Sequence, residues 1–503
     1  MIKKISLFLV SCLITLNVGA QSHAELSTTR YFETLKNNPQ LLLTFLQNMP
    51  KGGDLHNHVG GASLAENLIQ YGHNDHLCID QHSLSVAPNP HCSNENQLER
   101  ITQNTELYNQ LIDAWSMRNF HPLQESGHDH FFASFGKFFP IMNKHSSEML
   151  IEIANRASLQ HELYLELMVT PDLNASGQLG GKVGWDPNLT TLRQTLLSQG
   201  LKTIVADISK NLTQDEATLR QTLHCSTSPT HPGCEMKIRY LYQILREQPP
   251  ENVFAQLLAG FEAATQDARI VGINMVQPED GIIAMRDYKL HMHMVDFLHQ
   301  LYPNVHISLH AGELNSRLVP FEGLRFHIRD AVNIAHAERI GHGVDIAYEE
   351  NAAQLLKEMA KKAIMVEINL TSNAKILGVK GRNHPLPLYM QYHVPVALST
   401  DDEGVLRTNL TEQYQKAILT YHFSYPVVKN LVRNSIAYSF LPGKNLWENG
   451  EYTKIVSNCA KDNLGNSHPS PACQAFLTSN EKSQLQWELE KQFNQFEKSV
   501  TTR

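Results

Sequence analysis

The sequence predicts an α/β fold, a (β/α)₈ TIM barrel with an N-terminal helical extension and loop insertions. Two observations predict it. Eight short apolar or β-branched runs alternate with stretches of helical periodicity, as in a parallel barrel. Polar residues able to carry chemistry follow four of these runs, where the strands of such a barrel present their active site.

The eight runs predict the strands in chain order. They lie at residues 53–58, 163–169, 201–206, 270–275, 305–310, 339–342, 364–368 and 394–399. We expect the barrel over 53–446, with insertions at about 62–158 and 207–268 because these stretches exceed a minimal βα repeat. The extension covers 21–52, with apolar residues at helical spacing over 28–48, and a tail at 447–503 ends in a polar helix.

The N-terminus, residues 1–20, has the pattern of a signal peptide. Two lysines precede an apolar segment over 5–16, and Val18-Gly19-Ala20 offers small residues before a cut at Gln21. The apolar stretch is short for a transmembrane anchor. We therefore expect an exported protein, periplasmic or secreted. The alternative is a lipoprotein anchored at Cys12, which ends a lipobox-like Leu9-Val10-Ser11-Cys12.

Cysteine usage agrees with export. Removing the leader removes Cys12 and leaves six cysteines as three close pairs in polar segments: Cys78 with Cys92, Cys225 with Cys234, and Cys459 with Cys473. We predict three local disulfides, each closing a surface loop. Six free thiols are the alternative, and a cysteine-ligated zinc is disfavoured because no C-x-x-C motif occurs.

Composition narrows the partners. The chain has 503 residues, of which 42% are hydrophobic and 18% charged, with a net charge of −8. It carries no basic stripe, so neither nucleic acid nor an anionic membrane is expected as a partner. No segment after the leader is long and apolar enough for stable membrane insertion.

The polar residues at the strand ends predict a metal site. His56 and His58 form an H-x-H pair on a predicted strand, where residues two apart face the same side. His310, His342 and Asp401 follow other predicted strands. Three imidazoles and one carboxylate suit Zn²⁺ with one position open for water, and zinc lowers the pKa of such a water to about 7.

These motifs resemble the adenosine deaminases of the metal-dependent amidohydrolase superfamily. They are most similar to the secreted, adenosine-deaminase-related growth factor branch, and the similarity runs from about residue 28 to 446. Three segments carry the likeness to that branch: Met49-Pro50-Lys51-Gly52, His130-Phe131-Phe132 and Tyr438-Ser439-Phe440.

The resemblance implies a role for each matching residue. His56, His58, His310 and Asp401 become the ligands of one Zn²⁺ per chain. Glu313 becomes the acid that protonates purine N1, His342 orients or deprotonates the attacking water, and Asp402 hydrogen-bonds purine N7. A helix N-terminal acid is the structural alternative for Glu313, and an N-cap is the alternative for Asp402.

The sequence departs from the family pattern beside the metal pair. Adenosine deaminases often carry an acidic residue after the H-x-H that contacts ribose, but His58 is followed by Val59-Gly60-Gly61. The segment 272–280 resembles the purine-contacting loop, although Asn274 stands where Asp is common and Gln277 where Gly is common. Gln277 and Glu279 are therefore carried as weaker substrate-binding candidates.

Other histidines are not expected to bind the metal. His291 and His293 also form an H-x-H pair, but in a helical context where residues i and i+2 diverge. His128 and His130 lie in the first insertion and are expected to line or cover the mouth of the pocket.

Together these features predict an exported, zinc-dependent aminohydrolase that converts adenosine, or a close 6-aminopurine nucleoside, to the inosine product and ammonia. Two alternatives remain open: the same scaffold acting on another aminopurine or a nucleotide, and a secreted binding or signalling protein of the growth-factor branch. The resemblance is also compatible with a homodimer.

Overall fold

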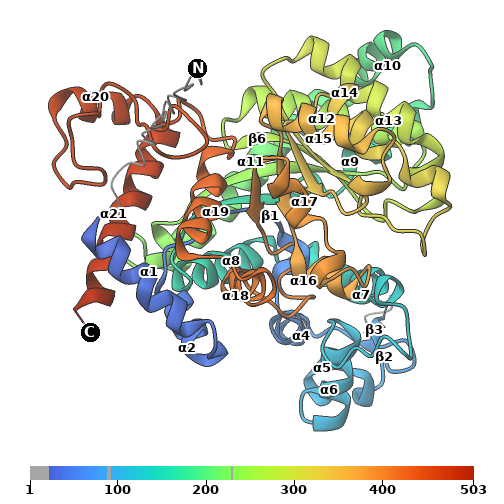
Figure 1. The fold of residues 1–503 in the computed structure, drawn as a ribbon. Helices are drawn as coiled ribbons and strands as arrows, with labels where there is room; N and C mark the ends of the chain where they lie inside the picture. Colours follow the sequence, from blue (N-terminus) through green and yellow to red (C-terminus); the bar gives the residue numbers. More distant parts are fainter. Residues whose placement is uncertain (1–21, 88–91, 228–229, 503) are drawn as a thin grey trace, which may run out of the picture.

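A single parallel sheet of eight strands forms the centre of the computed structural model, which describes residues 22–87, 92–227 and 230–502 (Figure 1). Neighbouring strands follow one another in the chain, as in a (β/α)₈ barrel. The strands are β1 (Gly52–His58), β4 (Glu162–Val169), β5 (Lys237–Leu245), β6 (Ile270–Val276), β7 (His306–Ala311), β8 (Arg339–His342), β9 (Met365–Ile368) and β10 (Val396–Leu398).

The barrel closes between its first and last strands. Asn57 of β1 and Asp401, just after β10, form a parallel bridge. The Asp401 N–H donates to the His56 carbonyl at 2.8 Å, and the His58 N–H donates to the Asp401 carbonyl at 3.3 Å. The ends of β1 and β10 therefore lie together, and the fold class predicted from the sequence is confirmed.

Helices surround this barrel. The helices that follow its strands from β4 onward are α9 (Ala175–Val183), α10 (Leu189–Leu196), α11 (Lys202–Thr222), α12 (Pro250–Gln266), α13 (Ile282–Leu301), α14 (His327–Asn333), α15 (Ala352–Lys362), α16 (Leu370–Lys375), α17 (Leu386–Gln391), α18 (Leu410–Tyr421) and α19 (Tyr425–Ala437). In Figure 1, α12, α13 and α14 lie together on the side of the barrel away from the two chain ends.

One predicted strand is wrong. Leu201 ends a π-helical turn over Leu197–Leu201, and residues 202–206 begin α11 instead, because the buried positions Val205, Ile208 and Leu212 continue at helical spacing beyond the short apolar run. The third barrel strand is β5, which pairs with β4 and β6. It lies within 207–268, so that segment contains a barrel strand and its helix α12 as well as an inserted loop.

The N-terminal extension folds as two helices rather than one. These are α1 (His23–Leu35) and α2 (Pro39–Asn48). Asn38 caps α2 by accepting from the Leu41 N–H at 3.2 Å, and Pro39 occupies the first helical position. A proline there starts a helix because its missing N–H has no partner to lose. This pair of residues therefore divides the predicted helix.

Lys51 fastens the chain where it enters β1. Its buried ammonium donates to the carbonyls of Leu46 at 2.6 Å, Met49 at 3.0 Å and Gln160 at 2.7 Å. Burial lowers the pKa of Lys51 to about 7, although the Glu162 carboxylate opposes the shift. The lead-in to β1 is thus bound both to the end of α2 and to the segment before β4.

The first insertion is mostly helical. It contains α3 (Val59–Ala62), α4 (Ala65–Asn74), the hairpin β2 (Ile79–Asp80) and β3 (Ser85–Val86), α5 (Leu98–Ile101), α6 (Thr105–Ala114), α7 (Gly127–Met142) and α8 (Ser146–Leu159). In Figure 1, α4 to α7 and the hairpin form a lobe beside the barrel, with α7 next to α16. Phe131 and Phe138 of α7 are buried, so the aromatic segment serves packing.

The structure contains the three predicted disulfides: Cys78–Cys92, Cys225–Cys234 and Cys459–Cys473. They span 14, 9 and 14 residues, so each closes a local loop. Residues 1–20, where the signal peptide and Cys12 are predicted, lie outside the described residues.

The tail packs against the N-terminal extension. It contains α20 (Pro471–Thr478) and α21 (Glu481–Thr501), and α21 lies beside α1 and α19 (Figure 1). Phe45 and Phe496 meet edge to face at 5.0 Å, and Lys429 of α19 donates to Glu497 at 2.7 Å. The two ends of the described chain thus stabilise one another.

Within the described ranges, none of the helices combines the length and the apolar character that crossing a membrane requires.

Candidate metal centre and active site

Four side chains from three places in the sequence meet at the C-terminal ends of the strands. They are His56 and His58 of β1, His310 of β7, and Asp401 after β10. One ligand atom from each lies within 4.8 Å of those from the others. His58 Nε2 is 3.3 Å from His310 Nε2 and 3.4 Å from the Asp401 Oδ1. The set could hold one metal ion in the geometry that three imidazoles and a carboxylate provide.

Each imidazole of this cluster makes a hydrogen bond through its Nδ1 atom to a side-chain oxygen on another strand of the barrel. Such contacts orient a metal-binding imidazole and fix which ring nitrogen faces the ion. The pairs are His56 Nδ1 with Glu367 Oε2 at 2.6 Å, His58 Nδ1 with Gln243 Oε1 at 2.6 Å, and His310 Nδ1 with Asn274 Oδ1 at 2.7 Å. All three Nε2 atoms are therefore directed at the same point.

His56 gives a direct test of whether a cation fits. Its Nε2 atom is buried and has no hydrogen-bond partner among the described residues. A buried polar atom without a partner is costly, and a metal ion at the centre of the cluster would supply that partner. The donor set and this orphaned nitrogen therefore both fit a cation.

The surroundings of Asp401 favour the ionised form of its carboxyl group. Burial raises the pKa of its carboxyl group, but the imidazoles of His56, whose Nε2 is 3.6 Å from Asp401 Oδ1, His342 and His58 together outweigh burial and hold the pKa far below its usual range. Its backbone is also unusual, with φ at 66° in the left-handed region. Such strain is typical of functional sites because the surrounding structure must maintain it.

A second group of side chains lies beside the cluster. Glu313, His342 and Asp401 also bring ligand atoms within 4.8 Å of one another. Glu313 Oε1 is 3.5 Å from His342 Nδ1, and His342 Nε2 is 3.8 Å from Asp401 Oδ2. Asn373 lies 3.0 Å from His342 Nδ1. His342 thus stands between an acid and the metal cluster.

Glu313 lies in surroundings that favour its neutral form. Burial raises the pKa of its carboxyl group well above the usual value, and the charges of Asp401 and Glu279 add to the rise. A neutral carboxylic acid can donate a proton to a substrate. The position of Glu313 beside the cluster therefore suits an acid catalyst.

The Glu279 carboxylate is engaged by other groups of the protein and is not free to contact a substrate. Its carboxylate accepts the backbone N–H groups of Gly312 at 3.0 Å and Glu313 at 2.8 Å, and pairs with His327 at 2.6 Å. Burial raises the pKa of Glu279, but the hydrogen bond from His327, the charges of His327 and Arg246 and the hydrogen bond from Gly312 together lower it by more. Glu279 thus holds the loop that presents Glu313.

The Gln277 side chain is also engaged by other groups of the protein. Its side-chain oxygen accepts the Glu247 N–H at 2.9 Å, and its carbonyl accepts Arg246 Nε at 3.0 Å. Its φ of 81° is in the left-handed region. The side chain and the carbonyl are therefore engaged with the end of the preceding strand, β5, which leaves the backbone N–H as the group that a ligand would meet.

Asp402 lies against Gly61. A Cβ atom on Gly61 would overlap the Asp402 carboxylate, and one on Gly60 would come within 2.7 Å of Met142 Cε in α7. The two glycines after His58 thus make room for Asp402 and for the insertion. Burial raises the pKa of Asp402 well above its usual value, and the Asp401 charge adds to the rise.

The other histidines singled out from the sequence lie outside the metal cluster. His291 and His293 lie on helix α13. His128 of α7 bonds Asp280 at 2.9 Å, so it joins the insertion to the loop after β6. His130 bonds the Ser116 carbonyl at 3.0 Å and Glu125 at 2.8 Å, within the insertion itself.

Sequence reasoning missed the residues that orient the imidazoles. Gln243 was hidden because its strand was not identified, and Glu367 lies inside an apolar strand where a carboxylate gave no motif. Asn274 was noted only as a departure from the expected Asp. A polar residue inside a predicted buried strand is the signal that could identify Asn274 and Glu367, whereas Gln243 lies in a segment that was not predicted as a strand.

A model of the adenosine deaminase family, described as "Adenosine deaminase", matches residues 104–448. The match leaves His56 and His58 outside its limits. An adenosine deaminase of Clostridium perfringens is 35% identical over 135 residues, which are 27% of this chain and 37% of that relative. The alignment thus spans just over a third of its length. One of Clostridium kluyveri is 26% identical over 260 residues, 50% of this chain and 68% of that relative.

Solved structures support the fold. The apo N6-methyl-AMP deaminase of Arabidopsis thaliana superposes with a TM-score of 0.52 at 19% identity, covering 79% of this chain and 94% of that chain. The Arabidopsis deaminase complexed with GMP gives 0.52 at 18% identity over the same shares. At this identity the likeness speaks for the fold alone.

Proposed function

The chain belongs to the adenosine deaminase family, and from that premise we propose that it is an exported, zinc-dependent enzyme that hydrolyses adenosine to inosine and ammonia. The observation that carries the proposal is the convergence of three imidazole nitrogens and the Asp401 carboxylate on one point, with Glu313 and His342 beside it. This arrangement serves hydrolysis of an amino group on a ring carbon.

His56, His58, His310 and Asp401 would hold the ion. Zn²⁺ in such a set supplies, when bound, Lewis acidity and a nucleophile for hydrolysis near neutral pH. The contacts from Glu367, Gln243 and Asn274 hold each imidazole in the orientation that binds the ion.

Glu313 and His342 would carry out the proton transfers. Attack at purine C6 places an electron pair on the ring, and a proton given to N1 by Glu313 stabilises it. His342 lies between Glu313 and Asp401, from where it can orient the attacking water and accept its proton. Asp402, pressed against Gly61, would hydrogen-bond N7 and fix the plane of the base.

Substrate recognition differs from the family pattern. No polar side chain follows His58 to accept the ribose hydroxyls, because Val59 is apolar and Gly60 and Gly61 pack against Met142 and Asp402. We propose that the first insertion, which reaches this position through α7, supplies the ribose contacts. Gln277 would contact the purine through its backbone, and Glu279 would act by positioning Glu313.

Export is supported by the three disulfides, which persist in oxidising compartments. A periplasmic or secreted location follows, with a lipoprotein anchored at Cys12 as the variant. Membership of the growth-factor branch belongs to the same proposal. A signalling role without catalysis would be supported if Glu313→Gln kept the full biological effect of the protein.

The test is a substrate panel. Ultraviolet-monitored deamination of adenosine, deoxyadenosine, adenine and AMP by the zinc-loaded mature chain should show adenosine with the highest kcat/KM. A preference for AMP or adenine would change the proposed substrate and leave the proposed reaction unchanged. No turnover of any of the four, with zinc bound, would contradict the proposed enzyme.

A further inference from the structure

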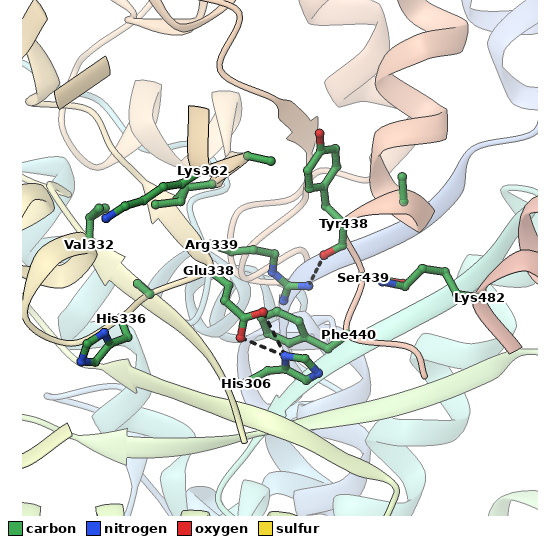
Figure 2. Close-up of a pocket in the computed structure, with 14 residues that line it drawn as sticks. His306, Val332, His336, Glu338, Arg339, Lys362, Tyr438, Ser439, Phe440 and Lys482 are labelled. Atoms are coloured by element: carbon green, nitrogen blue, oxygen red, sulfur yellow. Dashed lines mark hydrogen bonds and ion pairs between the residues drawn. The ribbon is translucent and has the colours of Figure 1, made fainter. Parts of the chain in front are cut away.

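A cavity of about 360 Å³ lies at the end of the barrel opposite the metal cluster (Figure 2). His306 and Arg339 line it, and they are the first residues of β7 and β8. His310 and His342 lie toward the other ends of the same strands. Since a strand rises about 3.3 Å per residue, four residues separate the cavity from the cluster by roughly 13 Å along β7.

One wall of the cavity is rigid and its charges are paired. The Phe440 ring stacks on His306 with centroids 4.5 Å apart, and the Arg339 guanidinium lies 3.8 Å from the Phe440 centroid. Arg339 donates to Glu166 at 2.6 Å and to Glu367 at 2.7 Å, both buried. Arg339 therefore has little charge left to offer a ligand.

The other charged residues of the wall are also neutralised, apart from Lys482. Glu338 pairs with His306 at 2.9 Å, and Lys362 pairs with Glu358 at 2.7 Å. Lys482 extends into the cavity from the start of α21 (Figure 2). Its ammonium makes no hydrogen bond or ion pair with any described residue.

Lys482 is the charged group of the wall that is free to bind an anion. Burial lowers the pKa of its ammonium group, with the Glu166 charge opposing the shift. The Lys482 side chain is partly exposed, and its unpaired ammonium is available for a charge-assisted hydrogen bond with an anionic ligand in the cavity. The remainder of the lining is largely apolar, with Val332, Ala363 and Ile364 among its members.

We propose that this cavity is a second binding site, which takes a small organic anion with an apolar body. The Lys482 ammonium binds the anionic group, and the apolar wall receives the body of the ligand. The volume falls within the range of about 300–1,000 Å³ that small-molecule sites occupy. Lys482 lies beyond residue 448, where the family match ends, so the tail of this chain supplies the charge that defines the site.

The test is calorimetric titration of the zinc-loaded mature chain with benzoate, and with benzamide as the neutral analogue. We expect benzoate to bind and benzamide to bind at least about tenfold more weakly, because the charge is what Lys482 recognises. Lys482→Met should weaken benzoate by about tenfold or more. Lys498→Met, at an exposed position of the same helix, should leave it unchanged.

Lys482→Arg keeps the positive charge and should retain binding, so the proposal stays testable if the methionine variant does not fold. Benzoate bound at the metal would bind equally to the wild type and to Lys482→Met, which would overturn the proposal. The absence of benzoate binding at millimolar concentration would also overturn it. None of these readouts depends on deaminase activity.

Discussion

At the scale of single residues, Gly61 shows how the site shapes the sequence around it. Gly61, three residues after the H-x-H pair, carries no side chain because Asp402 occupies the space that a Cβ would need. Gly61→Ala should displace Asp402 and lower kcat/KM by about tenfold to a hundredfold, as a misplacement near 1 Å does. Steady-state kinetics with adenosine measures this.

Gly136→Ala is the matched control, since a Cβ at that position of α7 would meet nothing within 4 Å. It should leave kinetics unchanged and slightly favour the helix. Equal kinetics in both variants would contradict the packing of Asp402 on Gly61 as the reason for the glycine.

Glu367 is the second residue with a specific role, because it holds His56 and Arg339 with its two oxygens. Burial raises the pKa of Glu367, but the charge of Arg339 and the hydrogen bonds from His56 and Ser308 outweigh burial and lower the pKa to about 2. Glu367→Gln should weaken metal affinity by about 10- to 100-fold, measured by competition with a chelator on the folded protein. Glu350→Gln, at an exposed site, should not. Unchanged affinity in Glu367→Gln would show that His56 needs no support.

At the scale of elements, the sequence predicts the strands whose local residue pattern agrees with their place in the barrel. β1, β7 and β8 were located because each ends in a polar motif. β5 was not, because it follows a disulfide loop and its Lys237 and Arg239 masked the strand pattern. Residues 201–206 satisfied the strand pattern locally, and only the packing of Val205, Ile208 and Leu212 made them helical.

The link between α7 and the barrel makes a prediction in pH. Burial lowers the pKa of His128, but Asp280 and Asp129 outweigh burial and raise it to about 9. The raised pKa means that the charged pair stabilises the fold fully below about pH 6.5, the unfolded value, and that this stabilisation is lost as pH rises through about 9.

Denaturant unfolding at several pH values measures the effect. His128→Gln should lower the free energy of unfolding by about 1 kcal/mol at pH 6, after allowance for solvent screening, and by almost nothing above about pH 9.5. His121→Gln, an exposed histidine of the same insertion, is the control. A difference that stays constant across this range would contradict the charged His128–Asp280 pair.

At the scale of the whole molecule, the sequence predicted the barrel and the residues that converge on the metal cluster. Their order along the chain, one motif per strand end, was sufficient for that. It could not predict Gln243 and Glu367 as imidazole supports or Lys482 as the lining of a cavity. The first two contacts join residues 185 and 311 positions apart, and Lys482 lies 143 positions from Arg339 in the same cavity. Only the closed barrel brings these residues together.

The disulfides and the metal centre are separate in the fold, which gives a whole-molecule prediction. All three bridges close loops outside the barrel strands. Mild reduction should therefore lower the unfolding free energy, by about 2–4 kcal/mol for a bridge such as Cys459–Cys473, and leave the metal content unchanged. Metal analysis after reduction checks this. Loss of zinc on reduction would mean that a cysteine contributes to the site.

The most direct measurement is adenosine deamination by the wild type and Glu313→Gln, each stripped with a chelator and then reloaded with zinc. We expect the stripped wild type to be inactive and zinc to restore it. Reloaded Glu313→Gln should bind one zinc per chain and yet lose about 10²- to 10⁴-fold in kcat, the range for a general acid. Turnover without metal, or near-wild-type kcat in Glu313→Gln with zinc bound, would contradict the account.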